Sequence, residues 1–547
     1  MSTKFDPKSK IWIGPQNKCI FNPEIGLGEI ILAVLARTPN KITQISADNG
    51  VKLTCNELRV KSIRLAENLK RKGYKFGDII ATVSRNNHDI SAVIFGCNII
   101  GAPVNCLDPN FTATEISDLL MITKPKLVFC ENYNLKNVQS ALNEINLKPE
   151  IILTGDEVHE DMIHVTSLYE EIKGLNERFY IPPSIPNPSK HTAIILCSSG
   201  TTGKSKGVCL SHSTMISHSS GSGNENDSLF CFSSLYWISG MLSLMMSTIS
   251  GMTRIITTEP FSGKRMCEII ENYKITRISA PPSQISQLLE YKNIDSVDFS
   301  SIQLFILGGS FVSDNLRKRL QKYLKNGVVI VTYGLTEIGG LASLTPPMSK
   351  LGSVGTLRPR MMAKIVDETG TNLGYNESGE ICIKFEFPFL RYYGDEIQTR
   401  NAFDSEGWVK TGDIGYFDEE NHLYMLDRKK DMFKYRNYQI NPSDIEEILQ
   451  KVTGILNICV VGIPDHDNGT DLPAALILKN EKIKLTETEI IKMAEENLPD
   501  YKHLRGGCYF VDALPLTPSG KVQRKLATEL ANQLYENNKN MLRKGTE

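Results

Sequence analysis

The sequence predicts an α/β protein with a large N-terminal domain and a small C-terminal domain. Apolar strand-like runs alternate with helical patterns over the first 180 residues and again up to about residue 345, which indicates two doubly wound α/β subdomains. Short β runs punctuated by glycine follow over residues 352–384 and predict a small β-barrel or β-layer. A new pattern begins at about residue 431, so we expect a separate small α/β unit there.

The composition is that of a globular protein without a dominant charge. The chain has 547 residues, of which 41% are hydrophobic and 22% are charged, and 61 Lys and Arg oppose 62 Asp and Glu. A chain of this length can bury a large core. Its net charge of −1 shows no basic excess of the kind that binds nucleic acid, so we expect no nucleic-acid partner.

The twelve cysteines are scattered, and none forms a Cys-x-x-Cys pair, so neither a zinc site nor a thioredoxin-like motif is indicated. Several stand in apolar runs, where a reduced cysteine behaves as a small hydrophobe, and we expect a reducing compartment. The first ten residues lack the apolar core of a signal peptide. The stretch Trp237–Gly251 is too short and too rich in serine to span a bilayer, so we expect a soluble protein.

The first subdomain contains a helix whose start is marked by side chains. Thr54 and Glu57 have the spacing of a capping box, and Leu58, Leu65 and Leu69 then mark one face of the helix. Buried strands are expected at residues 77–84, 127–130, 151–154 and, after a proline-rich connector at 181–188, at 192–197. Ligands of such sheets bind beyond the carboxyl ends of the strands.

The C-terminal unit is expected to contain two capped helices and a pair of strands. Ser443 and Glu446 have the spacing of a capping box, and Thr486 and Glu489 repeat it. The strands are expected at Ile455–Ile463 and Ala474–Lys479.

The strongest chemical signal is the loop Ser198–Gly207, with the sequence SSGTTGKSKG, directly after an apolar strand. Its glycines and hydroxyls allow backbone N–H groups to approach phosphate oxygens, and Lys204 and Lys206 add positive charge. The loop therefore predicts a phosphate site.

A Walker A loop of a P-loop NTPase is the weaker alternative. Gly203-Lys204-Ser205 ends like such a loop, but Ser198 stands where its first glycine belongs. The residues that follow, 207–212, have a strand pattern, whereas a Walker lysine opens a helix.

The loop resembles the phosphate loop of the adenylate-forming superfamily, which includes acyl-CoA synthetases, coumarate–CoA ligases, beetle luciferases and peptide-synthetase adenylation domains. Four more segments resemble motifs of that superfamily in the same order: Tyr333–Glu337 (YGLTE), Thr411–Asp413 (TGD), Asp427–Lys430 (DRKK) and Pro515–Lys521 (PLTPSGK). Five spaced motifs make a specific signal. The resemblance is nearest to the luciferase and coumarate–CoA ligase branch, and within it to luciferase-like fatty acyl-CoA synthetases.

The resemblance implies an AMP-binding N-terminal domain at residues 1–429 and a mobile C-terminal lid domain at residues 431–547, with a hinge at Lys430. It also implies a two-step reaction that uses ATP, Mg²⁺ and CoA. The carboxylate of an acid attacks the α-phosphate of ATP and releases pyrophosphate, and the thiol of CoA then displaces AMP from the acyl-adenylate.

Residue roles follow from the same resemblance. The phosphate loop contributes Ser198, Ser199, Gly200, Thr201, Thr202 and Gly203, the adenine loop contributes Gly308, Gly309 and Ser310, and the rest of the nucleotide site contributes Tyr333, Gly334, Asp413 and Arg428. The catalytic residues are Lys521, Thr336, Glu337 and Lys206. Glu337 is the only carboxylate in its motif, so it is the expected Mg²⁺ contact.

By resemblance, Trp237, Gly340, Leu341 and Leu344 line the acid pocket. The pocket-side run 338–344 carries no charge, and burying each CH₂ of an alkyl chain contributes about 0.8 kcal/mol. We therefore expect a medium- or long-chain fatty acid, with an aromatic, coumarate-like acid as the alternative. Luciferases and coumarate ligases carry a histidine where Trp237 stands, whereas fatty acyl synthetases often place an aromatic residue there. Luciferases also have a lysine-glycine pair at residues 436–437. The missing histidine and the missing lysine are both tied to the light-producing oxidation, so a luciferase is disfavoured.

A binding protein that keeps the fold but has little catalytic activity is the alternative to a ligase. Thr336, Glu337, Asp413, Arg428 and Lys521 are all present, which favours the enzyme. The sequence ends in KGTE rather than a Ser-Lys-Leu type signal, so we expect the cytoplasm, with the peroxisome as the alternative. The sequence contains no signal for an oligomeric state.

Overall fold

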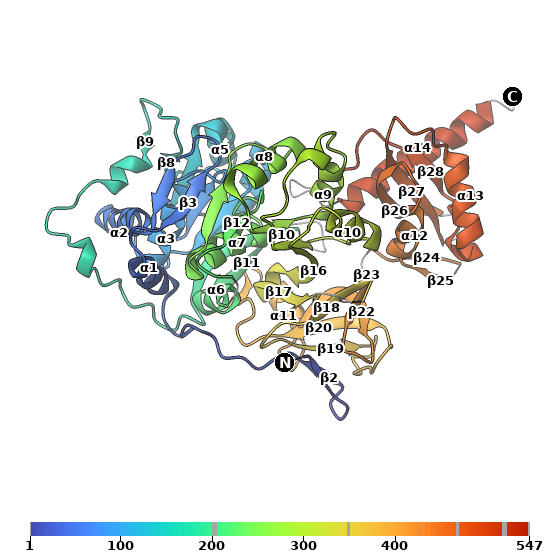
Figure 1. Ribbon diagram of the computed structural model, residues 1–547, viewed down its shortest axis with the longest axis horizontal. Helices are drawn as coiled ribbons and strands as arrows, with labels where there is room; N and C mark the ends of the chain where they lie inside the picture. Colours follow the sequence, from blue (N-terminus) through green and yellow to red (C-terminus); the bar gives the residue numbers. More distant parts are fainter. Residues whose placement is uncertain are drawn as a thin grey trace.

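The computed structural model describes residues 2–199, 205–221, 223–346, 350–429, 431–436, 438–465, 470–516 and 522–544. Figure 1 shows an N-terminal α/β part, a β-rich part that lies beside it, and a C-terminal part at one end of the molecule. The predicted α/β class is confirmed.

The first of the two large sheets has eight strands in the order β21-β11-β10-β6-β5-β7-β8-β9. Its strands are β5 (Ile80–Val83), β6 (Val104–Leu107), β7 (Leu127–Glu131), β8 (Glu150–Thr154), β9 (Ile163–His164), β10 (Thr192–Ser199), β11 (Ser205–Ser211) and β21 (Arg391–Tyr392). The six strands from β10 to β9 are parallel, and β11 and β21 add antiparallel edges. The four strands expected from the apolar runs all lie in this sheet.

The helices of this region are α1 (Leu27–Arg37), α2 (Cys55–Arg71), α3 (Ile90–Ile99), α4 (Ala113–Thr123) and α5 (Leu135–Glu144). The capping box predicted for α2 is confirmed, because Thr54 and Glu57 each bond the backbone N–H of the other. The predicted leucines at 58, 65 and 69 are buried. Local sequence therefore fixes both where α2 starts and which face it buries.

The second sheet has fifteen strands and a parallel half that continues into an antiparallel half. The parallel strands are β3 (Ile42–Ser46), β13 (Thr253–Ile256), β12 (Ser228–Phe230), β14 (Arg277–Ala280), β15 (Leu304–Gly308) and β16 (Val328–Leu335), with β4 (Lys52–Thr54) antiparallel at the edge. The helices that connect or follow these strands are α6 (His212–Ser219), α7 (Ile238–Ile249), α8 (Gly263–Tyr273), α9 (Pro282–Leu289) and α10 (Asp314–Gln321).

The antiparallel half holds β17 (Gly340–Leu344), β18 (Ser353–Leu357), β23 (Leu423–Arg428), β22 (Val409–Phe417), β20 (Gly379–Lys384), β19 (Met362–Val366), β2 (Ile11–Ile13) and β1 (Lys4–Asp6) in that spatial order. The β runs expected to form a barrel or a layer are therefore part of a layer that extends the parallel sheet. Helix α11 (Glu396–Asn401) lies between β21 and β22 in the chain.

The C-terminal part contains the hairpin β24 (Phe433–Tyr435) and β25 (Tyr438–Ile440), and a sheet of β26 (Ile455–Asp465), β27 (Thr470–Lys479) and β28 (Gly507–Phe510). Its helices are α12 (Pro442–Leu449), α13 (Glu487–Asn497) and α14 (Arg524–Lys544). The predicted capping box at Thr486 and Glu489 is confirmed at the start of α13.

The capping box predicted for α12 is wrong. The N-cap residue is Asn441, and the side chain of Ser443 instead bonds the carbonyl of Leu426 and the carboxylate of Asp427. Glu446 accepts the backbone N–H of Val460 at 2.8 Å and pairs with a distant arginine. The side chains of Ser443 and Glu446 are buried. Leaving a buried charge unpaired costs more free energy than losing one N-cap bond, so contacts with distant residues replace the local cap.

The cysteines behave as small core residues. Eleven of the twelve thiols are buried, and all are free. Burial raises the pKa of the Cys106 and Cys197 thiols to about 12, which keeps them protonated. Within the described part of the chain, no helix combines the length and apolar character needed to cross a membrane.

One aromatic side chain, Trp12, packs the N-terminal strands β1 and β2 against the antiparallel half of the second sheet. Trp12 on β2 is fully buried, and its ring stacks on Phe417 of β22 with centroids 4.4 Å apart. Truncation of this indole leaves a cavity in a dense cluster.

We expect Trp12→Ala to lower the free energy of unfolding of this part by about 3–5 kcal/mol. Ile20→Ala is the matched control because Ile20 is 69% exposed, and it should change stability by less than about 0.5 kcal/mol. Denaturant unfolding followed by circular dichroism measures both. Equal midpoints for the two variants would show that the indole does not hold the strands in place.

Candidate active site

A large cleft opens at the carboxyl ends of the parallel strands of the second sheet. The winding reverses beside β12, since β13 lies on one side of it and β14 to β16 follow on the other. Such a reversal leaves a crevice between the loops that leave neighbouring strands. Ser233 after β12, Ala280 at the end of β14, Gly308 at the end of β15 and Tyr333 on β16 all line the cleft.

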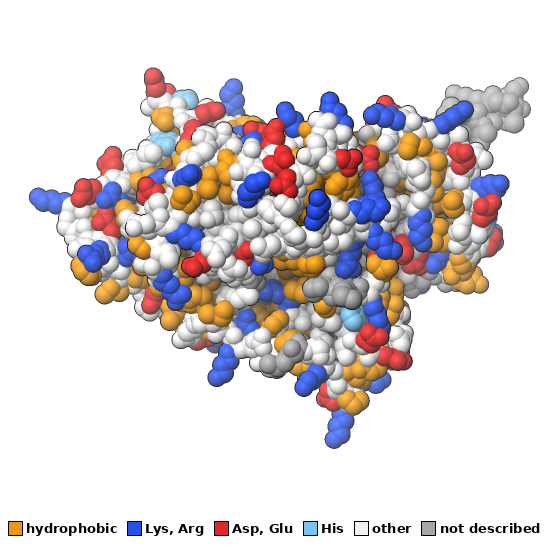
Figure 2. Space-filling model, in the orientation of Figure 1, with side chains coloured by type: hydrophobic (Ala, Val, Ile, Leu, Met, Phe, Trp, Pro, Cys, Tyr) orange, Lys and Arg blue, Asp and Glu red, His pale blue; other side chains and the backbone are white. Residues whose placement is uncertain are grey.

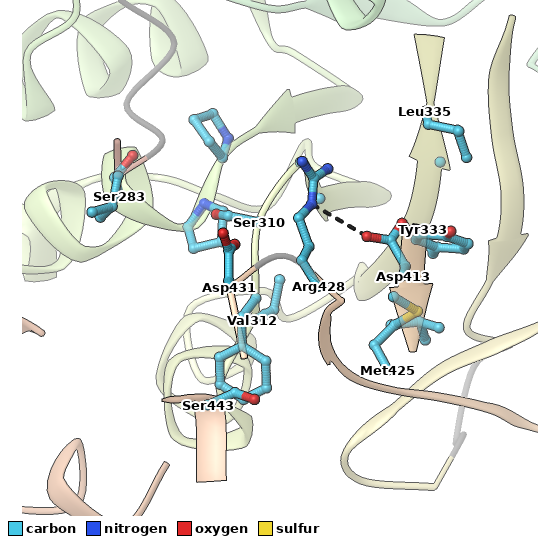
Figure 3. Close-up of a pocket in the computed structure, with 18 of the residues that line it drawn as sticks. Ser283, Ser310, Val312, Tyr333, Leu335, Asp413, Met425, Arg428, Asp431 and Ser443 are labelled. Carbon is cyan, nitrogen blue, oxygen red and sulfur yellow. Dashed lines mark hydrogen bonds and ion pairs between the residues drawn. The ribbon is translucent and has the colours of Figure 1, made fainter. Parts of the chain in front are cut away.

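Other parts of the molecule close this cleft. Cys197 on β10 and Lys206 on β11 line it from the first sheet, and Asp413 and Arg428 from the antiparallel strands. Asp431 and Ser443 of the C-terminal part also line the cleft and are labelled in Figure 3. The site is therefore composite, and no single motif forms it.

The predicted phosphate loop connects two antiparallel strands. Ser198 pairs with Lys206 across β10 and β11, and Ser199 pairs with Ser205. The loop residues Gly200, Thr201, Thr202, Gly203 and Lys204 lie outside the described residues. Because a strand follows the loop, the predicted strand is confirmed, and the Walker A alternative, which needs a helix, is wrong.

A buried carboxylate ties three strands together. The side chain of Asp413 on β22 accepts the hydroxyl of Tyr333 at 2.7 Å and pairs with Nε of Arg428 on β23 at 3.2 Å (Figure 3). Asp413 raises the pKa of Arg428, and burial together with Asp413 raises the pKa of Tyr333, so both partners stay protonated. The side chain of Arg428 is half exposed, so it is within reach of a ligand in the cleft.

Two predicted glycines allow close approach of backbones. A Cβ on Gly308 would lie 2.4 Å from Oγ1 of Thr332, and a Cβ on Gly334 would lie 2.3 Å from the carbonyl oxygen of Gly340. Any side chain would push the strands apart. Gly309 and Ser310 follow directly and line the cleft.

Thr336 and Glu337 lie in a single 3₁₀ turn, Thr336–Ile338, at the end of β16. Both line the cleft, as does Lys206. The carboxylate of Glu337 accepts the hydroxyl of Tyr392 at 3.0 Å. The predicted residues Lys206, Thr336, Glu337, Asp413 and Arg428, separated by up to 222 positions (428 − 206), therefore line one cleft.

Trp237 lines the same cleft and is held by a residue that the sequence analysis missed. Its indole N–H donates to Oδ2 of Asp108 at 3.1 Å, and the hydroxyl of Ser234 donates to the same oxygen at 2.8 Å. Asp108 is 2% exposed. It follows the buried strand β6 directly, so the rule that ligands collect at strand carboxyl ends could have identified it.

The uncharged run at residues 338–344 contributes less to the cleft than expected. Gly340 and Leu341 line it, but Leu344 is not among the described residues that do so. Helix α7 supplies Leu242 and Met246 together with the hydroxyl side chains of Ser239 and Ser243. The wall near Trp237 therefore mixes apolar surface with hydroxyls.

Lys430 and Lys521 lie outside the described residues, but their neighbours form an ion network. Arg524, on the first turn of α14, binds both carboxylate oxygens of Glu446 at 2.9 and 3.1 Å. Its Nε lies 3.6 Å from Asp431. The sequence analysis missed Arg524, and a partly buried ion pair between distant residues leaves no local signal.

The protein has almost no net charge, but several of its Lys and Arg side chains gather in one part of the surface. Figure 2 shows both signs of charge spread over one face, with several Lys and Arg side chains gathered where α10 meets the C-terminal part. Arg317 and Arg319 of α10 line the cleft. A near-neutral protein thus presents cations where anionic ligands would lie.

Comparison with known families decides the identity of this site. The family described as AMP-binding enzyme matches residues 32–393, and its C-terminal domain matches residues 444–521. The chain belongs to the AMP-binding enzyme family.

Individual relatives of this AMP-binding enzyme match along nearly the whole chain. A probable 4-coumarate–CoA ligase of Dictyostelium discoideum is 28% identical, over 94% of this chain and 96% of its own. The luciferase-like enzyme of the nonluminescent mealworm Zophobas morio is 30% identical with a TM-score of 0.72, over 77% of this chain and 99% of its own. An anthranilate CoA ligase solved with anthranoyl-AMP shares the fold, with a TM-score of 0.85 at 19% identity, over 94% and 98%.

The family match confirms the expected class, an adenylate-forming acid–CoA ligase that uses ATP, CoA and Mg²⁺. The described residues fit Mg²⁺, which proteins bind through one or two carboxylates while substrate phosphates and water complete the shell. Glu337 supplies a carboxylate in the cleft, and no described cluster of three or more metal-binding side chains offers a dedicated cage. Bound Mg²⁺ would neutralise phosphate charge.

We expect Asp108→Ala to raise the KM for the acid about tenfold, while the KM for ATP stays within about twofold, because the indole of Trp237 loses its buried acceptor. Asn110→Ala is the matched control, since it removes only the side-chain donor to the other oxygen of Asp108 and keeps the backbone N–H that also donates to it. Steady-state kinetics and acrylamide quenching of tryptophan fluorescence report the change. A variant with unaltered acid KM and quenching would show that Asp108 does not position the indole.

Proposed function

We propose that this AMP-binding enzyme converts a compact aromatic carboxylic acid into its CoA thioester through an acyl-adenylate. The observation that carries the reaction is the cleft in which the Tyr333–Asp413–Arg428 cluster, Glu337 and Lys206 converge. Two anions must meet in the first step, so the site must neutralise charge and align the reactants.

Each described residue has a task that suits its chemistry. Lys206 would hold the phosphates that leave as pyrophosphate, and Thr336 would donate to the α-phosphate. Asp413 retains lone pairs beyond those used by Tyr333 and Arg428 and would accept from the ribose hydroxyls. In the first step the acid oxygen bonds to the α-phosphorus as the bond to pyrophosphate breaks; in the second, the CoA sulfur bonds to the acyl carbon as AMP leaves.

An aromatic acid is favoured by the wall around Trp237. Tyr236 packs edge-on against Trp237 with centroids 4.7 Å apart, and Asp108 fixes the indole, so the acid would meet a rigid aromatic surface. Ser239 and Ser243 interrupt the apolar face of α7, which suits a ring with a polar substituent better than a plain chain. The names of the coumarate and anthranilate CoA ligases among the relatives point to the same class.

A medium- or long-chain fatty acid is the second candidate. Leu242, Met246 and Leu341 supply apolar surface to the same wall. An alkyl chain would gain about 0.8 kcal/mol for each CH₂ buried there. The luciferase reaction stays disfavoured, because Trp237 and Arg436 stand where luciferases have histidine and lysine.

We propose that residues 1–429 and 431–547 act as two domains about a hinge at Lys430. Ser443 bonds Asp427, and Arg524 pairs with Asp431, so contacts between α12, α14 and the hinge segment set one orientation. A rotation between the two half-reactions would exchange these contacts for others. We also propose a cytoplasmic location, on the basis of the free thiols.

We expect kcat/KM for CoA-thioester formation to be about tenfold or more higher with benzoate- or cinnamate-type acids than with alkanoates of six to sixteen carbons. Pyrophosphate release with ATP, Mg²⁺ and CoA measures the series, with Glu337→Gln as the inactive control. Highest activity on an alkanoate would replace this proposal by the fatty-acid candidate. Activity on none of the acids would indicate a binding protein.

We expect Lys521→Ala to lower acid-dependent exchange of pyrophosphate into ATP by about 10²–10³-fold, because one cation at the reacting carboxylate is lost. Thiolysis of a supplied acyl-adenylate should remain within about threefold of wild type, since that step does not join two anions. Lys482→Ala is the control lysine and should leave both steps unchanged. Equal loss of both steps would contradict the role assigned to Lys521.

A further inference from the structure

Tyr392 lies between the two charged groups expected to meet ATP. It stands on the short strand β21, where Val208 of β11 pairs with it, two positions along from Lys206. It is 8% exposed and lines the cleft. None of the five sequence motifs contains this residue.

The hydroxyl of Tyr392 contacts Glu337, and its ring contacts Lys206. The hydroxyl donates to Oε1 of Glu337 at 3.0 Å, and the ammonium of Lys206 lies 4.8 Å from the ring centroid. A cation over a ring and a hydroxyl on a carboxylate are both attractive contacts.

Gln398 holds the same lysine from a second element. Nζ of Lys206 donates to Oε1 of Gln398 at 2.9 Å. Gln398 lies on α11, which Asp395 caps by accepting the backbone N–H of Gln398. The hydroxyl of Thr399 accepts the backbone N–H of Tyr392 at 2.9 Å, so α11 is bonded directly to β21.

The two groups that contact Lys206, the ring of Tyr392 and the amide oxygen of Gln398, are both uncharged. A carboxylate paired with Lys206 would neutralise it and compete with phosphate, whereas an amide oxygen and an aromatic ring leave its charge intact. Likewise, a hydroxyl orients the Glu337 carboxylate without removing its charge. Tyr392 and Gln398 therefore position Lys206 and the Glu337 carboxylate through neutral groups that do not cancel either charge.

We propose that Tyr392 and Gln398 are positioning residues for adenylation: Tyr392 orients the Glu337 carboxylate toward Mg²⁺ and supports Lys206 with its ring, while Gln398 holds Lys206 ready for the phosphates. This proposal rests on the proposed function, which assigns Glu337 to Mg²⁺ and Lys206 to ATP. The two contacts of Tyr392 can be tested one at a time, because Tyr392→Phe removes the hydroxyl that contacts Glu337 and keeps the ring that contacts Lys206.

The test compares Tyr392→Phe, Tyr392→Leu and Gln398→Ala with Tyr393→Phe. The last is the matched control, since Tyr393 packs against the cluster of Ile79, Ile195 and Cys209. Mn²⁺ binding to the complex with a non-hydrolysable ATP analogue is followed by electron paramagnetic resonance. Binding of the analogue itself is followed by calorimetry, and pyrophosphate exchange gives the rates.

Tyr392→Phe should weaken Mn²⁺ about tenfold, with analogue affinity within about twofold, because only the hydroxyl to Glu337 is lost. Gln398→Ala should weaken the analogue about threefold to tenfold with Mn²⁺ affinity unchanged, and Tyr392→Leu should weaken both. Wild-type Mn²⁺ affinity in Tyr392→Phe, or equal losses of both ligands in every variant, would overturn the proposal. A wild-type protein that binds analogue and metal but activates no acid would instead contradict the proposed function, so the two failures are distinct.

Discussion

The cleft depends on one buried carboxylate. Asp413 is 4% exposed, and a charge at that depth is stable only when donors surround it. Tyr333 approaches from a strand 80 residues earlier, and Arg428 from the neighbouring strand, so the pairing fixes β16 against β22 and β23. The 3₁₀ turn with Glu337 begins at the end of β16, so its position follows from that anchor. Loss of this pairing would separate the elements that form the nucleotide side of the cleft.

The rest of the site is arranged around this anchor by two sheets. The large sheet reverses its winding beside β12 and leaves a crevice, and the hairpin of β10 and β11 from the smaller sheet directs Lys206 into it. A bond from the backbone N–H of Phe389 to the carbonyl of Glu337, 2.9 Å long, connects the segment before β21 to the turn. The two sheets therefore meet at the residues expected to bind phosphate and metal.

Sequence patterns predicted those parts of the fold and site that are local. The capping box at Thr54 and the strand after the phosphate loop follow from spacing and periodicity, since both depend on neighbours within a few residues. The predicted cap at Ser443 is wrong because its hydroxyl found Leu426 and Asp427, partners that no local pattern reveals. Tyr392 and Arg524 were not predicted for the same reason, whereas Asp108, directly after a buried strand, could have been found from the rule that ligands bind at strand carboxyl ends. Each is a common residue whose role comes from a contact across the fold.

The sequence by itself determined the family, the order of the motifs and the near-zero charge, because these are properties of the chain. Only the tertiary structure decided that β18 to β20 extend a sheet, that Leu344 is absent from the described lining of the cleft, and that serines of α7 join it. The physical reason is that a motif specifies backbone and side-chain chemistry over a few residues. Burial, charge pairing and the shape of a cleft arise from elements that the sequence separates by hundreds of positions.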